Sequence, residues 1–131
     1  MPSLRSAWVA FDLGCKMDNA DIADGDVNTI CVPMPFAGTI KEVWVTADIL
    51  PTTATLTIEK AVGAVDVSVL LATCAPQTDL TANVAASVAL ATNKKTLKVA
   101  AGDMLRATWT FTTIATGDGF GCLVMVEPDT W

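Results

Sequence analysis

Four aspartates between residues 18 and 26 form the densest group of chemically active side chains: Asp18, Asp21, Asp24 and Asp26. Clustered carboxylates are ligands that hard cations such as Ca²⁺ prefer. The spacing does not fit the usual twelve-residue calcium loop, because using Gly25 as the turn glycine puts Ala20 and Ile22 at ligand positions. We therefore expect a solvated turn with Asx-type hydrogen bonds here, and no metal site.

The sequence has no histidine, and its four cysteines are widely separated: Cys15, Cys31, Cys74 and Cys122. Mixed Cys/His zinc sites cannot form, and the most common catalytic base is missing. No glycine-rich phosphate loop is present. We expect no catalytic residues and no cofactor. Three disulfide pairings are possible on paper, but we expect buried, reduced thiols that pack as small hydrophobic side chains.

The tryptophans are the remaining candidates for contact with a ligand or partner, because tyrosine is absent. Trp44 and Trp109 are expected in the core. Aromatic residues and arginine often carry interface energy, and a chain end in a small domain has little core to offer. We predict a partner interface formed by Leu4, Arg5, Trp8 and Trp131. The alternative is that residues 6–12 are an internal strand and that Trp8 fills its own core.

The composition indicates association with other protein surfaces. The 131 residues are sufficient for one domain, yet 52% are hydrophobic and 17% are charged, against roughly 25% charged in a typical soluble domain. We expect a homo-oligomer, specifically a trimer. The net charge of −6 disfavours nucleic acid and anionic membranes as partners. The N-terminus is a poor secretory signal, so we expect folding in the cytoplasm.

Alternating side chains predict several strands. Residues 54–60, 104–113 and 120–127 place apolar residues on one face at every second position. In the stretch VPMPFAGTIKEVWVTAD, residues 32–48, Ile40 and Val43 break this alternation. A bulge near Lys41 and Glu42 would return both to one face. Residues 82–92 fit both a helical and an alternating pattern, and the neighbouring strands favour a strand.

Eight or nine short strands separated by turn residues predict an all-β fold, an antiparallel β-sandwich that is jelly-roll-like. We expect a single domain overall. Residues 1–28 would form an N-terminal strand or arm followed by the acidic loop, and residues 29–131 would form the sandwich.

The segments FAGTIKEVWVTAD, ATLTIEKAV and LKVAAGDMLRATWT, with a last strand ending VEP, resemble the small head-decoration (cement) proteins of tailed bacteriophages. The resemblance covers roughly residues 30–127. It implies a jelly-roll protein, often trimeric, that binds the major capsid protein on the outer capsid surface and braces neighbouring capsomers. The implied location is the virion, after synthesis in the host cytoplasm.

Two other functions fit the same sequence. One is a carbohydrate- or receptor-binding β-sandwich of a phage fibre or appendage, which would show coplanar exposed aromatics in a groove. The other is an enzyme or lectin-like domain that uses a metal held by the Asp-rich loop, which would melt in a metal-dependent way.

Overall fold

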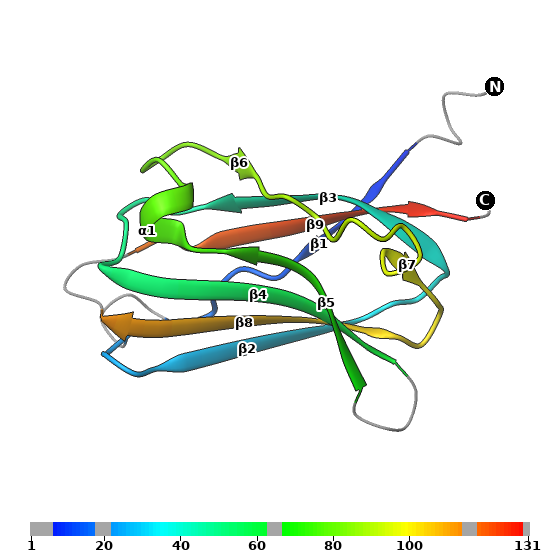
Figure 1. The fold of residues 1–131 in the computed structure, drawn as a ribbon, viewed down its shortest axis with the longest axis horizontal. Coiled ribbons are helices and arrows are strands. Elements are labelled where there is room, and N and C mark those ends of the chain that lie inside the picture. Colours follow the sequence, from blue (N-terminus) through cyan, green and yellow to red (C-terminus); the bar gives the residue numbers. More distant parts are fainter. Residues whose placement is uncertain (1–6, 18–21, 63–66, 114–117, 130–131) are drawn as a thin grey trace.

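The computed structural model describes residues 7–17, 22–62, 67–113 and 118–129. They form two antiparallel sheets that pack as two layers (Figure 1). Sheet A has the order β1 (Val9–Asp12), β9 (Gly121–Pro128), β3 (Gly38–Thr46) and β6 (Ala86–Ser87), and β7 (Lys98–Val99) also pairs with β3. Sheet B has the order β2 (Val27–Pro33), β8 (Met104–Thr113), β4 (Thr53–Val62) and β5 (Val67–Cys74). The predicted all-β sandwich is confirmed.

The strand pairing is nested like a long folded hairpin. β4 pairs with β5, β3 with β6 and β7, β2 with β8, and β1 with β9. Pairing of β3 with β9 and of β4 with β8 then completes the two sheets. This wrapping, with β6 and β7 acting as one interrupted strand, is the jelly-roll arrangement predicted from the sequence.

The core lies between the sheets, and β8 contributes to it by strict alternation. β8 buries Leu105, Ala107, Trp109 and Phe111 and turns its intervening residues outward. The rings of Trp109 and Phe111 stack at 6.5 Å, and both contact Phe120. The Trp109 indole Nε1 donates a hydrogen bond to the carbonyl of Leu13, 3.1 Å away. Trp109 therefore links sheet B to the chain that leaves β1.

The bulge predicted in β3 is present. Its register with β9 shifts between Ile40 and Glu42, which leaves Lys41 as the extra residue. Ile40, Val43 and Val45 consequently all face the core. Trp44 lies between two core residues and so faces outward, with 37% of its surface exposed. The prediction that Trp44 fills the core is wrong, whereas the same prediction for Trp109 is correct.

The segment between β5 and β7 is less regular than predicted. A one-turn helix, α1 (Pro76–Asp79), follows β5. Within residues 82–92, only Ala86 and Ser87 form a strand, while Val84 and Leu90 form isolated bridges. Alanines and polar residues here bury little surface, so they support only short stretches of pairing. Among the described residues, no helix is long and apolar enough to cross a membrane.

Candidate functional site: the outer face of sheet A

The outer face of sheet A carries an exposed group of large apolar side chains. The register places Trp44 of β3 beside Leu123 of β9, and Leu123 beside Asp12 of β1. One row further along, Met125 lies between Glu42 and Ala10. We call this surface the tryptophan face; it consists of Trp8, Ala10, Glu42, Trp44, Leu123, Met125 and Glu127.

Each tryptophan on this face is held by a glutamate. The Trp8 indole Nε1 donates to Glu127 Oε2 at 3.1 Å, and the Trp44 indole Nε1 donates to Glu42 Oε2 at 2.5 Å. Both indoles keep 37% of their surface exposed. A hydrogen bond at the ring edge restricts the side-chain rotamers while leaving much of the ring uncovered. The entropy lost when a partner binds to such a ring is correspondingly smaller.

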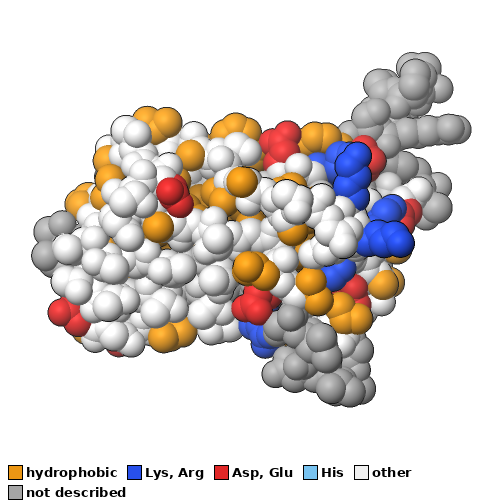
Figure 2. All heavy atoms as spheres, viewed as in Figure 1, with side chains coloured by type: hydrophobic (Ala, Val, Ile, Leu, Met, Phe, Trp, Pro, Cys, Tyr) orange, Lys and Arg blue, Asp and Glu red, His pale blue; other side chains and the backbone are white. Residues whose placement is uncertain are grey.

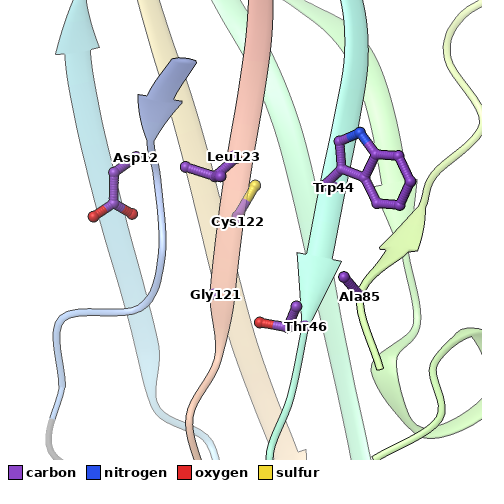
Figure 3. Close-up of a pocket in the computed structure, with 7 residues that line it drawn as sticks. All are labelled: Asp12, Trp44, Thr46, Ala85, Gly121, Cys122 and Leu123. Atoms are coloured by element: carbon purple, nitrogen blue, oxygen red, sulfur yellow. The ribbon is translucent and has the colours of Figure 1, made fainter. Parts of the chain in front are cut away.

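A hollow of about 460 Å³ opens on this face between Asp12 and Trp44. Figure 3 shows Asp12 and Trp44 on opposite sides of β9, with Leu123, Cys122 and Gly121 between them. Gly121 lines the floor of the hollow. A Cβ at this position would lie 2.6 Å from Thr46 Oγ1, which is too close to fit without a shift of Thr46. The hollow thus offers an indole on one side and a carboxylate on the other.

The carboxylate of Asp12 is held in its ionised form. A hydrogen bond from the Gly14 backbone N–H, 2.9 Å long, and the neighbouring Lys16 ammonium lower the pKa of Asp12 below its ordinary value. Asp12 is well exposed, so the ion pair with Lys16 contributes little to stability. The indole of Trp44 lies across β9 from this carboxylate, whose charge is already paired with Lys16.

The outer face of sheet B has different chemistry. Four threonines lie in register across its four strands: Thr29, Thr108, Thr57 and Thr73. Such a row presents small hydroxyl and methyl groups to solvent. The sandwich therefore has one face rich in aromatic and aliphatic groups and one face lined with threonine.

Figure 2 shows one side of the molecule, on which charged side chains are sparse. Lysine and arginine side chains gather at the end nearest β7, and much of the remaining visible surface is uncharged. This agrees with the low charged fraction of the sequence. The hydrophobic side chains visible on this side lie in small separate groups among uncharged polar side chains and backbone.

Of the predicted interface residues, only Trp8 lies among the described residues. It lies on the outer face of sheet A, immediately before β1, and does not fill the core. Leu4, Arg5 and Trp131 fall outside the described residues. Trp44 was missed as a surface residue, because it was predicted in the core. The predicted bulge already contained the signal for Trp44, because placing Val43 and Val45 inward turns Trp44 outward.

The acidic loop is described only in part, since Asp18 and Asp21 lie outside the described residues. Asp26 Oδ2 accepts a hydrogen bond from the Ala23 backbone N–H at 2.8 Å, as expected for a capped turn. Among residues 7–17, 22–62, 67–113 and 118–129, no three acidic, cysteine or histidine side chains lie together as a metal site. That the complete acidic loop binds no calcium stays a prediction.

All four cysteines are free thiols. Cys74 and Cys122 are buried as expected, and burial raises the pKa of Cys74 to about 11 and that of Cys122 to about 12. Cys31 contradicts the expectation of burial, because it faces outward from β2, and Cys15 is only half-buried. The strand period explains this: Cys31 follows the inward-facing Ile30 and so points to the other side.

Comparison with known proteins gives no match, either to a family model, to a curated protein or to a solved structure. The resemblance to phage head-decoration proteins therefore stays a prediction.

Proposed function

We propose that this protein is a structural component of a phage virion, which binds the major capsid protein as a homo-oligomer and stabilises the capsid from outside. The observation that carries the proposal is the exposed tryptophan face. Tryptophan, methionine and leucine on an ordered sheet form the kind of apolar centre that protein interfaces bury. Glu42 and Glu127 add negative charge to this centre, which favours a partner surface that carries arginine or lysine.

The sequence resemblance supports the choice of a capsid as the partner. Its matching segments form β3, β4, β7, β8 and the end of β9, which are central parts of the sandwich. Jelly rolls also occur among viral capsid proteins and lectins. Because one fold serves many functions, the fold supports this role only by analogy. The binding surface must be tested directly.

A matched pair of leucines tests the docking surface. Leu123 on the tryptophan face is 44% exposed, and Leu70 on the outer face of sheet B is 51% exposed. Removing buried CH₂ groups at an interface costs about 0.8 kcal/mol each. We expect Leu123→Ala to weaken binding to capsids of the major capsid protein encoded in the same genome by about tenfold or more, and Leu70→Ala to leave it unchanged. Equal binding by both variants would refute the proposal.

A carbohydrate- or receptor-binding role is the second candidate, and the hollow between Asp12 and Trp44 favours it. An indole can stack on a sugar ring, and an ionised carboxylate can accept hydrogen bonds from its hydroxyl groups. This function predicts retention of specific glycans on an array, lost in both Trp44→Ala and Asp12→Ala. Capsid binding with no glycan retention would leave the structural role as the conclusion.

A further inference from the structure

The two long sides of the sandwich differ in how their strand edges are covered. On one side, residues 80–99 run along the edges of β5 and β3, as Figure 1 shows in yellow-green. Three backbone hydrogen bonds of 2.8–2.9 Å hold this segment. The N–H groups of Ala91 and Val88 donate to the carbonyls of Leu71 and Val43, and the N–H of Ile40 donates to the carbonyl of Leu97. The buried Lys60 ammonium adds a bond to the Lys98 carbonyl. This side leaves little backbone free for a partner.

On the opposite side, β1 and β2 each have a single neighbouring strand among the described residues. Leu13 donates to Cys122, so the odd-numbered residues of β1 bond to β9. Trp8, Ala10 and Asp12 therefore direct their backbone N–H and C=O groups outward. At the two ends of β2, the Asp26 carbonyl accepts a hydrogen bond from the Phe111 N–H, and the Met34 N–H donates to the Asp103 carbonyl. The residues of β2 that alternate with these two direct their backbone groups outward, and they are Val27, Thr29, Cys31 and Pro33.

Within the part of the chain that the structure describes, the edge of β2 away from β8 lacks the usual protection against pairing. Its seven residues carry no charge, and its register with β8 contains no bulge. Exposed strand edges in monomers are normally blocked by lysine, by a bulge or by proline. Only Pro33, at the end of β2, meets that description.

Between the two open edges, Phe11, Val32 and Phe36 are only half-buried, and the rings of Phe11 and Phe36 lie 6.0 Å apart.

We propose that β2 of one copy pairs, antiparallel, with β1 of the next copy, so that sheet B of each copy continues into sheet A of its neighbour. β8 and β9 point in opposite directions in Figure 1, and β2 and β1 are antiparallel to them. β2 and β1 therefore run in opposite directions within one copy. Copies rotated about an axis parallel to the strands would meet with these two edges antiparallel.

One register satisfies all the outward backbone donors. Val27, Thr29 and Cys31 would face Asp12, Ala10 and Trp8 of the neighbouring copy. Pro33, which has no N–H, then lies beyond the paired stretch. The outward residues of both strands also point their side chains to the outer faces, so the two sheets join with the same side outward. Each copy offers one β1 edge and one β2 edge, so repeated pairing can close a ring.

A proline substitution tests the pairing. Thr29→Pro removes an N–H that points away from β8, so it leaves the hydrogen bonds of the protein's own sheet in place. Thr29→Val keeps that N–H and serves as the control. In light scattering we expect wild type and Thr29→Val to be oligomers of one size, and Thr29→Pro to be a monomer of 13.7 kDa with unchanged far-UV circular dichroism.

A disulfide tests the register independently of any folding defect in the proline variant. In a Cys31→Ser background, Thr29→Cys combined with Ala10→Cys places two thiols opposite each other between copies. A hydrogen-bonded antiparallel pair has its Cα atoms about 5.5 Å apart, within disulfide range. Within one copy the two positions lie in different sheets, about 10 Å apart. We expect linked oligomers on a non-reducing gel for the double variant and none for either single cysteine.

The results distinguish this contact from the proposed capsid role, although the inference rests on the self-association proposed above. A monomeric wild type, or a Thr29→Pro variant that keeps the wild-type mass, would overturn the edge pairing. An oligomeric double-cysteine variant without linked products would overturn the register. Neither result depends on Leu123, whose substitution tests capsid docking alone.

Discussion

Replacing Trp109 with phenylalanine is the most direct test of how the two sheets are held together. The indole is fully buried, and its N–H donates a hydrogen bond to the Leu13 carbonyl. Phenylalanine keeps an aromatic ring beside Phe111 and Phe120 but cannot donate that hydrogen bond. Trp44→Phe is the matched control, because the same atoms are removed from an indole at the surface.

The expected cost has two parts. Leaving the buried Leu13 carbonyl without a donor costs about 1–3 kcal/mol. The smaller ring leaves a void of roughly 40 Å³, which adds about 1 kcal/mol at the measured cost per unit of cavity volume. Trp109→Phe should therefore reduce the free energy of unfolding by about 2–4 kcal/mol. Trp44→Phe should cost less than about 1 kcal/mol, because water replaces its bond to Glu42.

Thermal and urea unfolding, monitored by circular dichroism, measure both variants. For a chain of this length the loss in Trp109→Phe corresponds to a fall in Tm of roughly 8–15 °C. All samples must have the same protein concentration, because self-association makes Tm depend on concentration. If the two variants lose stability equally, within about 0.5 kcal/mol, the assignment of Trp109 to the closed core is refuted.

The further predictions concern self-association, the thiols and the acidic loop. Light scattering of wild type should give a mass near three times 13.7 kDa, and a monomer at high concentration would contradict self-association. Denatured protein should titrate four free thiols without reductant. In the native protein at pH 8, Cys31 should react first and Cys122 last. Because unfolded thiols ionise near pH 8.5 and Cys122 only at about 12, stability should fall as the pH rises between these values. Calcium should leave Tm unchanged; a rise of several degrees, abolished by Asp24→Ala, would show that the acidic loop binds it.

The strands that bury one clean face could be predicted from the sequence. β8 begins and ends at the predicted residues, because apolar and polar side chains alternate without interruption from Met104 to Thr113. The bulge in β3 was also predictable, since Ile40 and Val43 cannot share a face without an extra residue. The conformation of residues 82–92 could not be predicted, because their small side chains bury little surface in any conformation.

The tryptophan face could not be found from the sequence because it depends on strand order. Trp8 and Trp44 lie far apart in the chain, and β9 brings them onto one surface by lying between β1 and β3. Residue type favours the core for Trp44, because tryptophan is highly buried on average. The parity of its neighbours Val43 and Val45 was the stronger indication.

The nested strand order has a consequence for folding during synthesis. Val9 pairs with Val126, so sheet A cannot form around β9 until synthesis has passed β9. At a synthesis rate of about 5–20 residues per second, β1 waits roughly 5–25 seconds for its partner. The β4·β5 pair is local and can form early, whereas pairs between distant strands fold slowly. A chain that stops before Gly121 lacks the strand joining β1 to β3, and such a product would expose unpaired edges that favour aggregation.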